Sequence, residues 1–193
     1  VSPTPGLIAQ MTGFRTTKRY RYATVYIDQG SRLSFTYLQK TATAEETFEG
    51  KQAFEKYSEQ RGVRIRGYHA NNGIFKANKW VLACRAKGFN LSFAGVNTQH
   101  QNGMAERRIR LLQELTRTML IHASKRWQNS VTANLWPYEL RMANNVLNKT
   151  PNMQDKARRT AQQIYSGVNI MPNPKHWKPF GCPVYVLDNK LKT

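Results

Sequence analysis

Two short segments, residues 21–27 and 33–38, are rich in β-branched and aromatic residues and are separated by Asp28-Gln29-Gly30-Ser31. β-Branched and aromatic side chains favour strands, and the residues between the two segments favour a tight turn. The pattern therefore predicts a β-hairpin with a short loop. A shorter apolar stretch, Leu7-Ile8-Ala9 with Met11, predicts another strand ahead of the hairpin.

A helix is predicted to follow the hairpin. Thr43 with Glu46 three residues later matches a capping box, which opens a helix at about Ala44. Gly62 is a stop signal for this helix. Apolar and basic residues then alternate over 63–67, which predicts a strand. Because a helix joins this strand to the earlier ones, it is expected to pair in parallel with one of them.

The rest of the chain continues the mixture of helices and strands. Apolar residues recur mostly at three- and four-residue steps over 104–124, which predicts the longest helix. The other predicted elements are helices at 79–87 and 135–147 and strands at 91–93 and 180–187. These elements together predict a mixed α/β fold. We expect one main domain over residues 1–150, and an extension over 151–193 that contains the last short strand.

The charge of the chain indicates a polyanionic partner. The 193 residues include 30 Lys and Arg against 11 Asp and Glu, a formal net charge of +19, which favours nucleic acid. Residues 1–59 carry 8 basic and 6 acidic side chains, net +2, whereas residues 60–193 carry 22 and 5, net +17. The later two-thirds are therefore expected to face the polyanion. Five acids fall on the helix predicted from Ala44, whose polar face should point away from nucleic acid: Glu45, Glu46, Glu49, Glu55 and Glu59.

Several other classes of protein are disfavoured. No apolar run approaches the roughly 18 residues of a membrane span, and no basic segment leads into an apolar one at the start, so we expect an intracellular protein, nuclear or cytoplasmic, without a membrane partner. The chain opens on Val1, which indicates a part of something longer. Cys84 and Cys182 are expected to be reduced core residues. The four histidines do not combine with them at zinc-finger spacing.

Six segments resemble, in order, the motifs of copia-type retrotransposon integrases. Their sequences are IAQMTG at 8–13, YIDQGSR at 26–32, HANNG at 69–73, QNGMAER at 101–107, AQQIYSG at 161–167 and FGCPVY at 180–185. In the same order they are similar to the family's HxDxxG, FIDDxSR, RSDNG, QQNGxAER, TPYELWxG and FGCxAYV. The resemblance implies a ribonuclease H-like fold, in which helices flank a mixed sheet. It also implies DNA integration as the activity of the family.

The resemblance implies three catalytic carboxylates, two of which are replaced here. Integrases of this kind hold two divalent ions, Mg²⁺ or Mn²⁺, with two aspartates and one glutamate. Glu106 matches the glutamate, whereas Asn71 stands at the second aspartate and Gln10 at the first. An amide oxygen can coordinate an ion but adds no negative charge. We therefore expect weak ion binding at Glu106 and a catalytically degenerate domain.

Simpler roles exist for the two acids nearest these motifs. Asp28 matches the acid of the family's own hairpin, where its carboxylate would accept backbone N–H groups of the turn. Taken without its motif, Glu106 would be a first-turn acid favoured by the helix dipole and paired with Arg110. With the preceding Gln101-Asn102-Gly103, we interpret Glu106 as a former catalytic position.

Candidate DNA-binding residues lie in and before the longest predicted helix. Arg107, Arg110 and Arg117 fall at helical steps that give one basic stripe, which would contact phosphates. The alternative is an ordinary solvated helix face, and the net charge of the later two-thirds favours the first interpretation. Gln99, Gln101 and Asn102 are further candidates, because the corresponding loop of the family contacts DNA near the reacting phosphate. They would otherwise be turn and cap residues.

Three functions remain open from the sequence. The first is an integrase-like DNA-binding domain of a retrotransposon that is catalytically degenerate. The second is an active polynucleotidyl transferase core that tolerates the two amides. The third is a basic scaffold or oligomerisation module without a DNA role. Under the first two, the expected partners are the retroelement ends, a target duplex and further copies of the chain.

Overall fold

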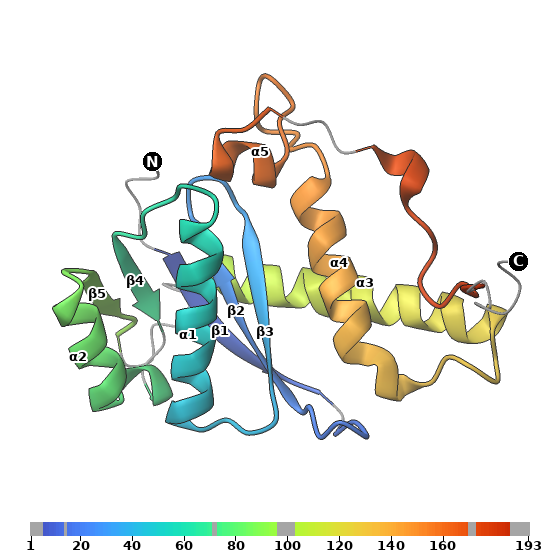
Figure 1. Ribbon diagram of the computed structural model, residues 1–193, viewed down its shortest axis with the longest axis horizontal. Coiled ribbons are helices and arrows are strands. Elements are labelled where there is room, and N and C mark those ends of the chain that lie inside the picture. The colour runs from blue at the N-terminus through green and yellow to red at the C-terminus, as the bar shows by residue number, and fades with distance from the viewer. Residues whose placement is uncertain (1–5, 14, 71–72, 96–102, 170–172, 186–193) are drawn as a thin grey trace, which may run out of the picture.

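The computed structural model describes residues 6–13, 15–70, 73–95, 103–169 and 173–185, with the backbone alone at 6–9. A mixed sheet of five strands lies at its centre, in the order β3-β2-β1-β4-β5 (Figure 1). The strands are β1 (Gly6–Thr12), β2 (Tyr22–Ile27), β3 (Ser34–Gln39), β4 (Gly67–Ala70) and β5 (Asn90–Phe93). The first three pair antiparallel, whereas β4 is parallel to both β1 and β5. The predicted mixed sheet is therefore confirmed.

Helices cover both faces of this sheet. They are α1 (Ala44–Glu59), α2 (Asn78–Ala86), α3 (Gly103–Arg126), α4 (Trp136–Lys149) and α5 (Ala161–Ser166), with single 3₁₀ turns at Ile74–Lys76, Ala133–Leu135 and Pro174–His176. Figure 1 shows α1 and α3 on opposite sides of the sheet. None of the helices in the described residues is long and apolar enough to cross a membrane.

Alternation along the strands separates two cores. In β2, Val25 packs in a cluster with Leu112 of α3 and Leu140 of α4, whereas its neighbour Tyr26 packs on the other face. There the Tyr26 ring stacks on that of Phe54 in α1, with 4.9 Å between the ring centroids. Successive strand residues point to opposite faces, so each residue of β1 and β2 belongs to the α1 side or to the α3 side.

Close contact between α1 and the sheet requires a glycine. A Cβ atom added to Gly50 of α1 would lie 2.8 Å from the Tyr37 ring and 3.1 Å from the Tyr26 hydroxyl oxygen. Such a substitution would push α1 away from β2 and β3, because interiors of proteins are close-packed. Of the predicted capping box, the N-cap hydrogen bond is confirmed, since Thr43 Oγ1 accepts from the Glu46 N–H, whereas the Glu46 side chain bonds two residues ahead of Thr43. The Glu46 carboxylate accepts from the Thr41 N–H, at 2.7 Å.

Of the predicted strands, one is shifted along the sequence and one does not form within the described residues. The parallel strand is β4, which begins at Gly67, and residues 63–66 lead into it without strand structure. No strand forms over the described part of 180–187, which ends at residue 185. Gly181 has a left-handed backbone (φ 77°) that interrupts an extended segment. It also packs against the end of α3, since an added Cβ would lie 2.7 Å from Val131.

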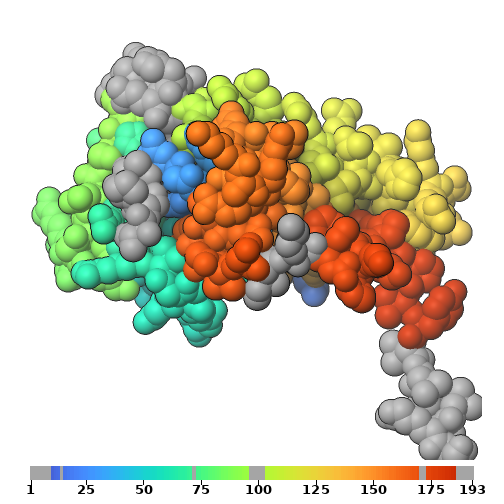
Figure 2. All heavy atoms as spheres, turned by 90° about the horizontal axis from the view of Figure 1, so that it is seen from above, coloured from blue at the N-terminus to red at the C-terminus, as the bar shows by residue number. Residues whose placement is uncertain are grey.

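The segment after α4 is attached to the sheet by α5. Tyr165 and Ala161 of α5 pack on the buried Leu33, which precedes β3. The Tyr165 hydroxyl also donates a hydrogen bond of 2.7 Å to Ser58 Oγ at the end of α1. Seen from above, the surface of this segment adjoins that of α1 (Figure 2). Residues far apart in the sequence are thus joined at one end of the sheet.

A buried ion pair lies between α1 and the neighbouring elements. Lys51 is fully buried, and its Nζ is 2.5 Å from Glu55 Oε1. The second Glu55 oxygen lies 2.6 Å from Lys87 Nζ, and the Tyr68 hydroxyl donates to Glu55 Oε1. Four aromatic rings lie 5.5–5.8 Å from the Lys51 ammonium: Phe48, Tyr68, Trp80 and Phe89. The Glu55 carboxylate is therefore the main counter-charge of a buried cation.

A buried carboxyl group in α4 has a different environment. Both oxygens of Glu139 are buried and accept no hydrogen bond from the described residues. Burial raises the pKa of this carboxyl group from 4.5 to about 7, because the charged form is poorly solvated there. The native protein thus holds a proton on Glu139 at pH values where the unfolded chain has released it.

We predict that Glu55→Gln lowers the free energy of unfolding by about 3 kcal/mol, because it leaves the buried Lys51 ammonium without its counter-charge. Chemical denaturation followed by circular dichroism measures this change. The matched control is Glu59→Gln on the same helix, whose side chain is exposed and whose replacement should change stability by less than about 0.5 kcal/mol. Equal effects of the two substitutions would contradict the assigned role of Glu55.

We also predict that Glu139→Gln changes how stability depends on pH. A folded-state pKa above the unfolded value means that stability falls as pH rises between about 4.5 and about 7. The loss through Glu139 should reach about 2–3 kcal/mol, and the amide, which does not titrate, should remove it. Urea unfolding at pH 5, 6, 7 and 8 tests this expectation, with the exposed Glu114→Gln as control. An unchanged pH profile in Glu139→Gln would refute it.

Candidate functional site

Glu106 is an exposed carboxylate in the first turn of α3. The preceding Ala105 is buried in the core, which turns Glu106 outwards by about 100° around the helix. None of the ion pairs among the described residues includes Glu106, so it is not bound to Arg110 as the simpler interpretation required. Its carboxylate is therefore available to a ligand.

The turn between β2 and β3 holds the start of α3. Arg108 donates a hydrogen bond of 2.6 Å from Nη2 to the Arg32 carbonyl oxygen, and Arg32 donates from Nη1 to Met104 Sδ. Burial, together with the charge of Arg32, lowers the pKa of the Arg108 guanidinium. Arg32 itself has a left-handed backbone (φ 65°). Neither arginine was singled out for this role from the sequence.

Asp28 organises the same turn. Its Oδ2 accepts hydrogen bonds of 2.7 Å from both the backbone N–H and the hydroxyl of Ser31. The Asp28 backbone N–H and carbonyl bond to Leu33 and Arg32. The predicted turn role of Asp28 is confirmed, and its buried carboxylate is occupied by these contacts. Asp28 thus supports Glu106 indirectly, through the turn that carries Arg32.

Gln10 lies on the other side of the sheet from Glu106. Gln10 Nε2 donates to Gln39 Oε1 at 3.1 Å, and Gln39 in turn donates to Thr47 of α1. The next residue, Met11, packs in the core formed with α3 and α4. The prediction that Gln10 shares a site with Glu106 is therefore corrected: strand alternation directs the Gln10 side chain towards α1.

The described residues do not fit a two-ion catalytic site. β1 has the sequence GLIAQMT and contains no acid, and no group of three His, Cys, Asp or Glu side chains with metal-binding geometry occurs within the described ranges. Asn71 lies outside the described residues. Glu106 is thus a single carboxylate, which supplies too little negative charge for two dications.

The three predicted DNA-binding arginines of α3 are all exposed: Arg107, Arg110 and Arg117. At 100° per residue, Arg110 and Arg117 lie within about 40° of Glu106 around the helix, whereas Arg107 lies about 100° from it. The rise of 1.5 Å per residue separates Arg107 from Arg117 by about 15 Å. Gln99, Gln101 and Asn102, which precede α3, lie outside the described residues.

His69 adds a polar group that the sequence did not single out. It lies in β4 between Tyr68 and Ala70, which pack in the core with α1 and α2, so its side chain points to the α3 side of the sheet. Its Nδ1 is 2.9 Å from Ser92 Oγ in β5. The signal that could have found it is the pairing of β4 with β5, which requires the fold.

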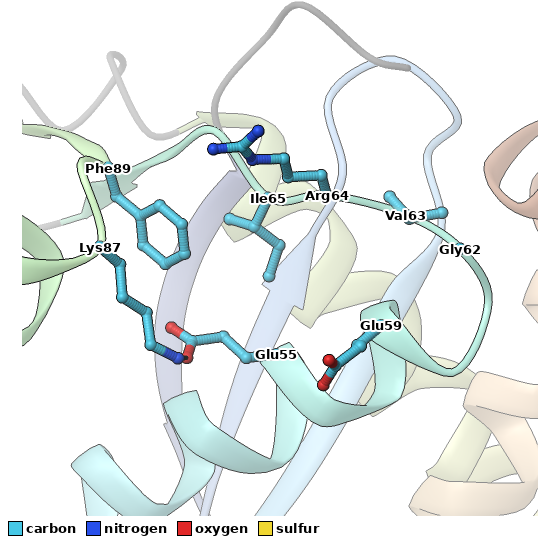
Figure 3. Close-up of a pocket in the computed structure, with 8 residues that line it drawn as sticks. All are labelled: Glu55, Glu59, Gly62, Val63, Arg64, Ile65, Lys87 and Phe89. Atoms are coloured by element: carbon cyan, nitrogen blue, oxygen red, sulfur yellow. Dashed lines mark hydrogen bonds and ion pairs between the residues drawn. The ribbon is translucent and has the colours of Figure 1, made fainter.

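A hollow of about 370 Å³ lies between α1, the segment before β4 and the segment before β5. Figure 3 shows Lys87 reaching Glu55, while the Arg64 guanidinium points away from Glu55 and Glu59. Ile65 and Phe89 supply its apolar wall. Its two carboxylates are matched by two cations in the lining, so the hollow has no excess positive charge for a polyanion and does not extend the surface around Glu106.

Comparisons with known proteins agree with this geometry. No protein-family model matches the chain. The retrovirus-related Pol polyproteins from transposons RE1 and RE2 of Arabidopsis thaliana are 26% and 27% identical to it over 168 and 169 residues. That of transposon TNT 1-94 of Nicotiana tabacum is 23% identical over 167 residues. Each match covers 86% of this chain, which spans only 11–12% of the length of these polyproteins.

Solved structures show the same fold. The HTLV-2 integrase catalytic core domain in complex with magnesium has a TM-score of 0.61, with 86% of this chain and 99% of that chain covered. A chain of the simian T-cell lymphotropic virus intasome in complex with PP2A regulatory subunit B56 gamma has a TM-score of 0.65, with 90% and 58% covered. The catalytic core domain of BIV integrase has a TM-score of 0.57, with 83% and 91% covered.

These three structures are each 18% identical in sequence to the chain, a level at which they establish the fold alone. The Pol polyproteins supply the relationship in sequence. The chain is therefore a homologue of copia-type retrotransposon Pol polyproteins, with the ribonuclease H-like fold of an integrase catalytic core.

Proposed function

We propose that this integrase-like core binds DNA through the exposed face of α3 and is catalytically degenerate as it stands. The observation that carries the DNA-binding part is the shared position of Glu106, Arg110 and Arg117 on one exposed stripe of the helix. None of these arginines forms an ion pair within the described part of the chain. Unpaired guanidinium groups suit phosphate oxygens, and they bind without regard to base sequence.

The proposed loss of catalytic activity is supported by the positions of the acidic residues. Glu106 is exposed on α3, β1 offers no carboxylate, and residue 71 is an amide. We therefore propose that Mg²⁺ or Mn²⁺ binds weakly here, although the HTLV-2 core was solved in complex with magnesium. Retroelement ends and a target duplex are the proposed DNA partners.

Self-association is the second proposed property of the chain. The HTLV-2 integrase core is described in a trimeric and a dimeric form, and its simian relative in an intasome. We propose that this chain also acts as an oligomer, in the nucleus or the cytoplasm. A basic scaffold without a DNA role is the outcome if the binding experiment below fails.

DNA binding should depend steeply on salt and on the α3 arginines. We predict that the variant with Arg107, Arg110 and Arg117 all replaced by Gln binds a 30-base-pair duplex at least tenfold more weakly in about 0.1 M salt, with a salt slope reduced by about 2–3. Fluorescence anisotropy at several salt concentrations measures both. The control variant has three exposed cations elsewhere replaced by Gln, at Lys56, Arg64 and Arg85. It should lose far less affinity for DNA. Salt-independent binding, or equal loss in both variants, would reject binding through the α3 arginines, and the absence of DNA binding altogether would leave only the scaffold function.

Strand joining should be absent from the unmodified chain. Joining of a labelled DNA end to a target duplex, in Mg²⁺ or Mn²⁺, is expected to stay at the background of Glu106→Gln, because two dications need more than one carboxylate. Asn71→Asp should raise the affinity for Mn²⁺ without restoring joining. Robust joining by the unmodified chain that Glu106→Gln abolishes would show that the site is active.

A further inference from the structure

A second cluster of cations lies at the opposite end of the sheet from the start of α3. It lines a hollow of about 440 Å³ between the β1–β2 connection and the segment that leads into α1. The basic residues that line it are Arg15, Arg19, Arg21 and Lys40. All four side chains are exposed, and none belongs to an ion pair among the described residues. The aromatic ring of Tyr22 also lines the hollow.

The hollow has one acidic residue, which is already in use. The Glu46 carboxylate accepts a hydrogen bond of 2.7 Å from the Thr41 N–H at the start of α1. Four cations therefore face a single carboxylate. Gathering like charges is unfavourable unless solvent or an anion compensates them. The helix dipole of α1, whose N-terminus adjoins the hollow, adds to the positive potential.

Hydrogen bonds connect the backbone segments around the hollow. The Arg21 N–H donates to the Gln39 carbonyl at 3.0 Å, which ties the β1–β2 connection to the end of β3. At the tip of this connection the Tyr20 N–H donates to Thr16 Oγ1, and Arg19 takes a left-handed backbone (φ 64°). The arginines thus project from a connection whose described residues are hydrogen-bonded to the end of β3 and to one another.

We propose that this hollow binds the phosphodiester backbone of a nucleic-acid strand, as a contact separate from the α3 arginines. The planar guanidinium groups of three arginines suit phosphate oxygens, and Lys40 adds a further cation. The Arg21 guanidinium lies 5.6 Å from the centre of the Tyr22 ring, which leaves an aromatic surface beside the cations for a base or sugar. Exposed cations along an open hollow favour a strand that passes across them.

The two contacts are far enough apart to be tested separately. Tyr22 begins β2, and Arg32, which binds the start of α3, lies just beyond its end. Six residues of strand at about 3.3 Å each place the two contacts about 20 Å apart. Loss of one contact should therefore leave the other intact.

The experiment uses the full chain with Arg15, Arg19, Arg21 and Lys40 all changed to Gln, in the presence and absence of the α3 triple variant. A matched control changes four exposed cations elsewhere to Gln: Lys56, Arg64, Arg66 and Arg85. DNA binding is measured by anisotropy on single-stranded and duplex oligonucleotides. In the α3 triple background, the hollow variant should lose at least a further tenfold in affinity. The control should lose less than about threefold.

Three outcomes of this experiment would overturn the proposal. Equal losses in the hollow variant and the control would reduce the effect to net charge. Binding of inorganic pyrophosphate that the hollow variant abolishes, with DNA binding unchanged, would assign the hollow to a small anion. Loss of DNA binding in the α3 triple variant alone would keep the proposed function and reject the second contact. Loss of DNA binding in the hollow variant alone would reject the contact through the α3 arginines and keep the contact in the hollow.

A second measurement does not depend on the folding of any variant. Acetylation of lysines in the unmodified chain, read by mass spectrometry, should be slowed at Lys40 by bound DNA and unchanged at Lys56, which lies on the outer face of α1. Equal modification of Lys40 with and without saturating DNA would reject the second contact.

Discussion

The position of α3 depends on the turn that follows β2. Asp28 closes this turn through Ser31, and Arg32 then receives the Arg108 guanidinium on its carbonyl oxygen. Arg108 is only two residues from Glu106, so this hydrogen bond also positions Glu106 at the start of the exposed face of α3. The integrase-like segment at 26–32 thus contacts the start of α3, where Arg32 Nη1 also donates to Met104 Sδ. The Asp28 carboxylate, which accepts hydrogen bonds from the Ser31 N–H and hydroxyl, is already occupied and is unsuited to a metal.

Most elements of the fold were predictable because they depend on local sequence. The hairpin, the capped helix α1 and the long helix α3 follow from strand-forming residues, Thr43 and apolar periodicity, and the structure confirms them. The shift of β4 was not predictable, because residues 63–66 have the alternation of a strand although β4 begins only at Gly67. The exposed arginines of α3 were found from helical spacing. The roles of Arg32, Arg108 and His69 required tertiary contacts.

Net charge summed over the sequence concealed where the cations lie. Residues 1–59 are nearly neutral because their 6 acidic side chains offset most of their 8 basic ones. Five of these acids fall on α1, while Arg15, Arg19 and Arg21 lie together at the β1–β2 connection. Of these acids only Glu46 lines the hollow with the arginines, and its carboxylate accepts a hydrogen bond from the Thr41 N–H, while Glu55 pairs with the buried Lys51. A segment that seemed neutral therefore carries a basic hollow at one end.

The alternation of side chains along β1 also decides whether an acid restored there could reach Glu106. A carboxylate placed at Gln10 would face Gln39 and the α1 side of the sheet, so it could not approach Glu106 on α3. Moving it one residue along, to Met11, would bury it in the apolar core of α3 and α4, where a charge is poorly solvated. Neither position can rebuild a site shared with Glu106.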